Sequence, residues 1–531
     1  MSGSVTNSSV SGTVDGSNST GGLVGNLDGD ITNSYANSSV DGGSEVGGLV
    51  GINADGGITT SYAVGAVNES GLASQAGGLV GENSGTVENS YWDTGTTGQT
   101  DDGDDTTGNG LTTERMTGNN ATVAGNMDGL GFYDEWIPTA SYPELAWRFV
   151  SESTGDGSEA DPFLVSDEYG LQAITANLTA NYVLDGDIDA SNTEQWNDGA
   201  GFEPIANGSQ FSGSIDGDGH AIRDLTINRS SAFDVGLISQ MAPESNVSNL
   251  TIVDATVSGG DISGTLAGLN NGAISEVVIT DVQAGTDEPF AYAFGGLVGE
   301  NYGEIEDSHI SGSLSTYEGN RIGGLAGRNE GIVRESTTNT SIFASPGFMI
   351  GGFIGENSGD ISNSSSNGTL SVSNGEYVGG FIGENSAGIS NSSSNGTLSV
   401  SNGEYVGGFI GENSADITNS STTVIVNAAG GNGIGGLIGL NNEGLISGSY
   451  AAGSIEGESE IGGLIGENSA GTISESYATG EVTGESELGG LVGLNIGIFG
   501  GDIAGTVVSS YATGDVSGDG DNIQYFTKLV S

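Results

Sequence analysis

Residues 379–406 read GGFIGENSAGISNSSSNGTLSVSNGEYV, and residues 351–378 carry the same stretch with two of 28 positions changed. Looser copies of its GG-apolar-apolar-G segment extend in both directions. In the second half of the chain these segments begin at Gly295, Gly323, Gly351, Gly379, Gly407, Gly435, Gly462 and Gly489. The spacing is 28 residues five times and then 27 twice. A fixed period of this length indicates a repeat architecture, in which each unit buries its apolar face against its neighbours.

Three apolar columns appear when the copies are aligned. Each column member lies in a short run bounded by Gly, Asn or Ser and rich in branched residues, which favours strands over helices. The first column is Leu297, Leu325, Phe353, Phe381, Phe409, Leu437, Leu464 and Leu491. The second is Ile305, Val333, Ile361, Ile389, Ile417, Ile446, Ile473 and Val507. The third is Leu314, Ile342, Leu370, Leu398, Val426, Ile455, Val482 and Val516.

Three strands in 27–28 residues predict a triangular coil. Parallel stacking of such coils about 4.8 Å apart pairs their backbones and aligns the apolar columns as a core. The sequence therefore predicts an all-β fold, a right-handed parallel β-helix or β-solenoid, because crossover connections are right-handed. We expect the glycines to allow tight corners with positive φ.

The repeats fall into two arrays. We expect a first array at 1–98, which begins in the middle of a repeat as if the reading frame started upstream, and an aromatic capping segment at 99–148. An entry cap with the first coils of the second array is expected at 149–233, the second array itself at 234–518 and a tail at 519–531. The capping segment holds Trp136 and Trp147, and stacked repeats need covered ends; an aromatic sugar-binding surface is the alternative.

Two polar columns accompany the core. Asparagine recurs two residues after the last glycine of each motif, as at Asn357, Asn385 and Asn413. Serine recurs three residues after the second apolar column, as at Ser364, Ser392 and Ser420. Stacked identical side chains form hydrogen-bonded ladders, so we interpret both columns as structural.

The formal net charge is −61, with 69 acidic residues against seven Arg and one Lys. Such a surface repels nucleic acids and anionic membranes, so no nucleic-acid partner and no direct membrane insertion are expected. The acid excess is typical of proteins from salt-loving archaea, since molar salt shortens the screening length to about 3 Å. An acidic calcium-binding adhesin of moderate salinity is the alternative. The chain has no Cys and no opening signal peptide.

The pattern GGLVGEN-x-G-x-I-x-x-SYA-x-G-x-V-x-G resembles the GLUG repeat of bacterial and archaeal surface proteins, including adhesin-like and IgA-peptidase-like chains. The resemblance covers about 1–98 and 234–518. It implies an exported, extended β-solenoid, located outside the cell or at the cell surface. It implies no enzymatic activity for the repeat and no cofactor.

Carboxylates are the candidate cation ligands. Glu356, Glu384 and Glu412 recur once per coil, and stacking like charges at strand spacing is unfavourable unless they are screened or bridged. A second candidate is the turn carrying Asp185, Asp187 and Asp189, whose hard oxygens suit calcium. Calcium and monovalent cations are both open, and solvated acidic turns are the plainer interpretation. The two histidines, His220 and His309, fall on different coils and suggest no catalytic constellation.

Asn-x-Ser/Thr sequons at Asn363, Asn367, Asn391 and Asn395 are candidate glycosylation sites of an exported chain, although an Asn/Ser-rich repeat also generates sequons by chance. Together the patterns predict a non-catalytic extracellular or cell-surface protein adapted to high salt, an adhesin, stalk or envelope component. Surface glycans or other cell-envelope proteins are its expected partners. The alternatives are a secreted β-helix polysaccharide lyase or glycosidase, which would use paired carboxylates, and a purely structural spacer.

Overall fold

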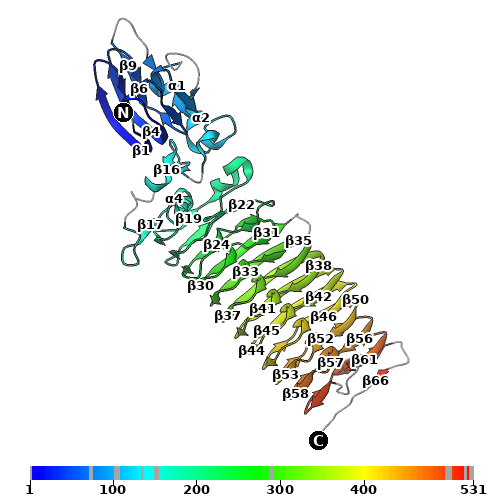
Figure 1. Cartoon of the computed structure of the whole chain (residues 1–531). Coiled ribbons are helices and arrows are strands. Elements are labelled where there is room, and N and C mark those ends of the chain that lie inside the picture. Colours follow the sequence, from blue (N-terminus) through cyan, green and yellow to red (C-terminus); the bar gives the residue numbers. More distant parts are fainter. Residues whose placement is uncertain are drawn as a thin grey trace. The chain divides into compact units, whose positions relative to one another are not determined.

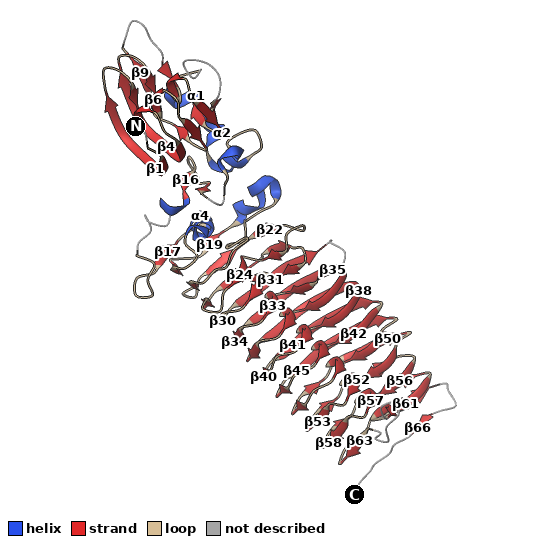
Figure 2. Cartoon of the chain, in the orientation of Figure 1, coloured by secondary structure: helices blue, strands red, loops and turns tan. Residues whose placement is uncertain are grey.

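The computed structural model describes residues 3–70, 76–100, 108–132, 135–148, 155–286, 292–496, 505–518 and 523–524. It is a parallel β-solenoid of about 17 turns with coils of about 28 residues, 56% strand and 8% helix (Figures 1 and 2). The chain divides into two compact units. The first comprises Met1–Asp156, Asp167–Asn177 and Gln195–Gly199; the second comprises Gly157–Ser166, Leu178–Glu194 and Ala200–Ser531.

The first unit holds a short solenoid with three faces. Its eight-stranded face contains β1 (Val5–Asp15), β4 (Ile31–Gly42), β7 (Gly57–Thr59), β8 (Tyr62–Ala63), β9 (Val67–Glu69), β12 (Thr86–Glu88), β13 (Tyr91–Asp93) and β14 (Asn109–Leu111). The two three-stranded faces contain β2 (Thr20–Gly21), β5 (Val46–Gly47) and β10 (Ala76–Gly77), and β3 (Val24–Leu27), β6 (Val50–Asn53) and β11 (Val80–Asn83).

The aromatic segment that follows packs on the flank of this solenoid as well as extending its edge. β14 adds in parallel to β13, and Trp92 lies in the core. Tyr35 and Tyr62 stack outside the coils with ring centroids 4.9 Å apart, and Trp136 packs 5.3 Å from Tyr62. The segment contains α1 (Thr94–Thr97), α2 (Thr113–Met116), η1 (Gly118–Thr122), η2 (Asp128–Leu130), β15 (Trp136–Ile137) and β16 (Glu144–Leu145).

The second unit stacks its coils as three parallel sheets. The ten-stranded sheet A contains β24 (Ile238–Met241), β29 (Ala267–Asn270), β33 (Val298–Asn301), β36 (Ala326–Asn329), β39 (Ile354–Asn357), β43 (Ile382–Asn385), β47 (Ile410–Asn413), β52 (Ile438–Asn442), β57 (Ile465–Ser469) and β62 (Val492–Ile496). The thirteen-stranded sheet B contains β17 (Phe163–Val165), β18 (Asn181–Leu184), β20 (Ser214–Asp216), β25 (Asn246–Ser248), β30 (Ala273–Ser275), β34 (Glu304–Glu306), β37 (Ile332–Arg334), β40 (Ile361–Ser362), β44 (Ile389–Ser390), β48 (Ile417–Thr418), β53 (Leu445–Ser447), β58 (Thr472–Ser474) and β63 (Thr506–Val508).

Sheet C is the widest face, with 27 strands. Its strands are β19 (Ile188–Asp189), β21 (Ala221–Arg223), β22 (Thr226–Asn228), β23 (Asp234–Val235), β26 (Thr251–Val253), β27 (Thr256–Ser258), β28 (Ile262–Ser263), β31 (Val278–Thr286), β32 (Ala293–Gly295), β35 (His309–Gly323), β38 (Thr337–Gly351), β41 (Ser365–Ser373), β42 (Gly375–Gly379), β45 (Ser393–Ser401), β46 (Glu404–Gly407), β49 (Ser421–Thr422), β50 (Ile425–Ala429), β51 (Asn432–Gly435), β54 (Tyr450–Ala451), β55 (Ile455–Glu456), β56 (Ser459–Gly462), β59 (Tyr477–Ala478), β60 (Val482–Gly484), β61 (Ser486–Gly489), β64 (Tyr511–Ala512), β65 (Val516–Gly518) and β66 (Ile523–Gln524). Helices α4 (Glu168–Ala173) and η3 (Ile174–Ala176) belong to the first unit, while η4 (Ser191–Gly199) is shared between the units.

The predicted three faces per coil are present, but sheet C has more than one strand in most coils. β35 and β38 each run unbroken for 15 residues. In the following coil the same path is split at Asn374 into β41 and β42. The predicted coil of three strands is therefore a coil of three faces with a segmented third face.

The core follows the predicted columns. Phe353, Phe381 and Phe409 are fully buried and stack with centroid separations of 4.6 and 4.7 Å. Additional fully buried columns lie beside them, as at Ile382 and Val378. Stacking identical side chains at strand spacing leaves few voids, so each coil packs onto a copy of its own surface.

An asparagine ladder runs along the inside of sheet A. Each side-chain amide donates to the Oδ1 of the next coil at 2.7–2.9 Å, and all eight bonds point the same way. The members are Asn270, Asn301, Asn329, Asn357, Asn385, Asn413, Asn441, Asn468 and Asn495. Most of them also donate to a nearby backbone carbonyl, as Asn385 does to Ala387 at 2.8 Å. Their burial is therefore matched by hydrogen bonds.

A serine ladder occupies the corner after sheet B. The backbone N–H of Ser364 donates to Ser392 Oγ at 3.3 Å, and that of Ser392 donates to Ser420 Oγ at 3.3 Å. Each hydroxyl donates in turn to the carbonyl two residues before it, as from Ser392 to Ser390 at 3.0 Å. The residue before each serine adopts positive φ, as in Asn363, Asn391 and Asn419.

The expectation that glycines allow tight corners with positive φ is confirmed at positions such as Gly430, Gly433 and Gly448, but it does not apply to the motif glycines. Most of the corner residues before the ladder serines are Asn, Asp or Glu, and the exceptions are Gly448 and Ser509. Asn and Asp tolerate the left-handed region better than branched residues do. The motif glycines instead allow backbones to approach closely. A Cβ on Gly383 would lie 2.5 Å from the Ile350 nitrogen and 2.6 Å from the Gly355 oxygen.

Candidate functional site

The predicted glutamate column lies on sheet A. Glu356, Glu384 and Glu412 are direct register partners on β39, β43 and β47. All three are half-buried rather than fully exposed to water. Because parallel strands lie about 4.8 Å apart, the three carboxylates form a closely spaced row.

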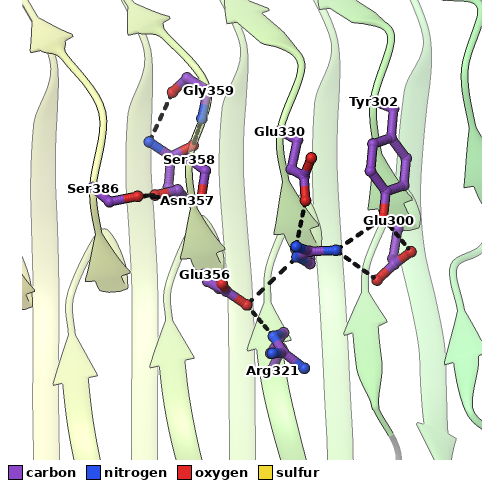
Figure 3. Close-up of polar contacts among 10 residues, drawn as sticks. Glu300, Tyr302, Arg321, Glu330, Glu356, Asn357, Ser358, Gly359 and Ser386 are labelled. Carbon is purple, nitrogen blue, oxygen red and sulfur yellow. Dashed lines mark hydrogen bonds and ion pairs between the residues drawn. The ribbon is translucent and has the colours of Figure 1, made fainter.

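One end of the row is neutralised by arginine. In the register of this column Arg328 of β36 stands between Glu300 and Glu356. It contacts Glu356 at 3.6 Å, Glu300 at 3.7 Å and Glu330, while Arg321 of β35 pairs with Glu356 (Figure 3). Tyr302 donates to Glu300 at 3.1 Å. Glu356 therefore has two cationic partners within the protein.

The other two glutamates of the row, Glu384 and Glu412, have raised pKa values. Burial raises the pKa of Glu384, and the neighbouring carboxylates of Glu412 and Glu356 raise it further. Burial likewise raises the pKa of Glu412, although a hydrogen bond from Tyr377 opposes this. Tyr405 has a pKa raised to about 12 by burial and by nearby glutamates. This part of sheet A is thus a half-buried, acidic strip bordered by two tyrosines that stack 5.9 Å apart.

Among the described residues, no group of three or more His, Cys, Asp or Glu side chains is arranged to hold one metal ion. Cation binding by Glu356, Glu384 and Glu412 stays a prediction.

The candidate turn at Asp185–Asp189 does not bring its carboxylates onto one point. Asp187 accepts from the Ala221 backbone at 3.0 Å and from Arg223 at 3.1 Å, and both interactions lower the pKa of its carboxyl. The pKa of Asp189 is lowered by the Ser191 hydroxyl and also by the Ser191 N–H, which donates to Asp189 at 3.0 Å. Two of the three predicted calcium ligands, Asp187 and Asp189, thus already have protein partners, and calcium binding by this turn stays a prediction.

The sequons occupy two different environments. Asn363 and Asn391 are exposed at the positive-φ corners. Asn367 and Asn395 lie within β41 and β45, where the Asn395 amide donates to Asn367 Oδ1 at 2.9 Å. Asn363, Asn391 and Asn395 are exposed, whereas Asn367 is half-buried. Glycosylation stays a prediction.

The raised pKa values predict that stability at low salt falls as pH rises. Because the folded-state pKa values of Glu384 and Glu412 lie above the ordinary value of 4.5, the native state holds extra protons between 4.5 and those values. The contribution is fully present below pH 4.5 and is lost as pH rises through the folded pKa. Urea unfolding between about pH 5 and pH 7 measures this slope. The Glu384→Gln/Glu412→Gln double variant serves as the comparison, and a slope equal to that of the wild type would contradict the prediction.

Substitutions along the row should have opposite signs. We expect Glu384→Gln to raise stability at low salt by a few tenths to about 1 kcal/mol, since it removes like-charge contacts. Glu356→Gln should lower stability, because Arg321 and Arg328 lose their shared partner. Molar NaCl should shrink the Glu384→Gln effect. Urea midpoints at both salt levels give the test, and equal effects of the two substitutions would refute it.

The arginine network was absent from the predicted site, although the sequence carried a signal for it. The motif GGFIGEN becomes GGLAGRN at 323–329, which puts Arg328 in the glutamate column. The roles of Arg321, Glu300 and Tyr302 depend on packing between separate strands and have no comparable sequence signal.

No helix in the described part of the chain is long and apolar enough to cross a membrane. Residues 457–483 match the Glug family, described as the GLUG motif. Over 155 residues, 28% of this chain, the sequence is 41% identical to Halomucin of Haloquadratum walsbyi, and the match spans 2% of that protein.

Two solved structures are similar at low TM-score. One is a Bacteroides ovatus protein provisionally described as an immunoglobulin A1 protease, with 16% identity over 58% of this chain and 79% of that chain and a TM-score of 0.36. The other is the A-module of an Azotobacter vinelandii mannuronan C-5 epimerase, with 11% identity over 70% and 99% and a TM-score of 0.24. The matched coil 457–483 repeats the asparagine, serine and apolar columns of its neighbours. Residues 457–483 are therefore one GLUG-motif coil within a β-solenoid of similar coils.

Proposed function

We propose that the chain is a non-catalytic, salt-adapted part of a cell-surface or extracellular protein, acting as a stalk or adhesin. The observation that carries the proposal is the continuity of the asparagine ladder, from Asn270 to Asn495, through coils that share the same apolar and polar columns. Such a stack supplies length and a repeated surface. The similarity to Halomucin supports an extracellular setting and high salt.

A catalytic role finds less support in the arrangement of carboxylates. Among the carboxyl groups with raised pKa, Glu384 and Glu412 are register neighbours on one strip, and Glu467 lies two coils beyond Glu412 on the same sheet. The pKa values of Glu460 and Asp234 are also raised, mainly by burial. A glycosidase or lyase would instead need two carboxyl groups with separate roles around one bond.

Location and catalysis are tested separately. Antibodies against the chain should label intact source cells, or the medium, before any permeabilisation, and external protease should remove the cell-bound signal. Labelling only after permeabilisation would refute the surface proposal. Purified chain in molar NaCl should release no new reducing ends or unsaturated uronates from acidic polysaccharides. Turnover lost in a carboxylate variant would establish the enzymatic alternative.

A further inference from the structure

Two adjacent coils of sheet C carry three exposed aromatic rings. Tyr317 on β35 is 55% exposed, and Phe343 and Phe348 on β38 are each 50% exposed. At the positions of Tyr317 and Phe343 the next two coils carry serine, at Ser371, Ser373, Ser399 and Ser401. The rings are therefore a local departure from a hydroxyl-covered face.

Tyr317 and Phe343 lie on the same outward face. The register pairs Ser315 with Phe343 and Tyr317 with Ser345, so the two rings are diagonal neighbours on adjacent strands. From strand spacing and rise, their Cα atoms lie about 8 Å apart. β35 and β38 pair along almost their full 15 residues, which holds the two rings on a rigid support.

The charge and size of this surface limit its occupant. Tyr317, Phe343 and the serines beside them are uncharged, and the adjacent Glu318 is half-buried, within a chain of net charge −61 that repels polyanions. Three half-exposed rings offer about 300 Å², well below the roughly 800 Å² per partner of a stable protein interface. A second copy of the chain is therefore a poor fit, and a small neutral ligand a better one.

We propose that Tyr317 and Phe343 form a binding site for a neutral saccharide. One face of a pyranose ring presents C–H groups, which pack on the electron-rich face of an aromatic ring. The hydroxyl groups around the edge of the pyranose ring can form hydrogen bonds with the serines beside the two aromatic side chains, Ser315, Ser345 and Ser371. This inference deepens the proposed function by naming a ligand class. Purified chain can bind a sugar wherever the protein resides, so failure of one proposal does not entail failure of the other.

The test is a microarray of neutral and uronate-containing oligosaccharides probed with the full chain in molar NaCl. Each neutral oligosaccharide bound is then titrated by calorimetry. The Tyr317→Ser/Phe343→Ser variant introduces the residue that neighbouring coils carry, so its fold should persist by circular dichroism. We expect it to lose affinity about tenfold or more. The matched control is Ile425→Thr, which removes another exposed apolar side chain of sheet C and should bind like the wild type.

Three outcomes would overturn the proposal. One is an array on which no neutral saccharide binds the wild type. Another is equal affinity in the wild type and the folded double variant. The third is self-association in sedimentation that the double variant abolishes, which would assign the rings to contact between copies of the chain.

Discussion

Replacing Asn385 by Leu should destabilise the second unit by about 2–5 kcal/mol. Asn385 is 1% exposed, accepts from Asn357 at 2.8 Å and donates to Asn413 at 2.8 Å. The substitution leaves the Asn357 amide without this acceptor and the Asn413 Oδ1 without this donor. Water does not reach either atom to replace the lost partner. Leu27 fills the same column in the first unit and is fully buried there. Leucine therefore fits sterically, and the expected loss comes from hydrogen bonding.

Urea unfolding in constant molar NaCl, followed by circular dichroism, measures this loss. The matched control is Asn395→Ala, because Asn395 also bonds between coils, to Asn367 at 2.9 Å, but on the exposed surface. Its effect should stay within about 0.5 kcal/mol. Equal losses of unfolding free energy in the two variants would mean that the buried ladder stabilises the fold no more than an exposed hydrogen bond does.

Replacing Gly383 by Ala should cost about 3 kcal/mol or prevent folding of the array. The added Cβ would meet backbone atoms of β38 and β39 at 2.5–2.7 Å, and these cannot move without displacing their own strands. Gly388→Ala is the control, since the nearest atom to its Cβ would be Asp360 Oδ1 at 3.4 Å. We expect that variant to unfold at the wild-type midpoint. A Gly383→Ala protein as stable as the Gly388→Ala protein would contradict the close-packing role of the motif glycines.

Periodicity made the solenoid, its core columns and its polar ladders accessible from sequence. In a stack of repeats, each residue lies next to the equivalent residue of the neighbouring coil. An alignment of the repeat copies therefore predicts which residues are in contact. Features that depart from the repeat were harder to predict. The flank packing of Trp136 on Tyr62 and the pairing of Arg321 with Glu356 join residues with no common period.

Corner geometry was a different case. Glycine is the usual residue for positive φ, yet here Asn391 takes that conformation while Ser392 bonds the neighbouring coil. Sequence composition alone cannot distinguish a glycine needed for its dihedral from one needed for lack of a Cβ. Gly383 belongs to the second kind.

Removal of one whole coil tests the central claim most directly, namely that the array supplies length and a repeated surface from interchangeable coils. Deleting 379–406 joins Val378 to Gly407, which recreates the Val–Gly junction already present between coils. We expect the shortened chain to keep its circular dichroism per residue and its urea midpoint, because the ladders close again across the junction. Deleting 379–392 removes half a coil, puts every column out of register and should unfold the array. If the whole-coil deletion were as damaging as the half-coil deletion, the coils would not be interchangeable and the account would be wrong.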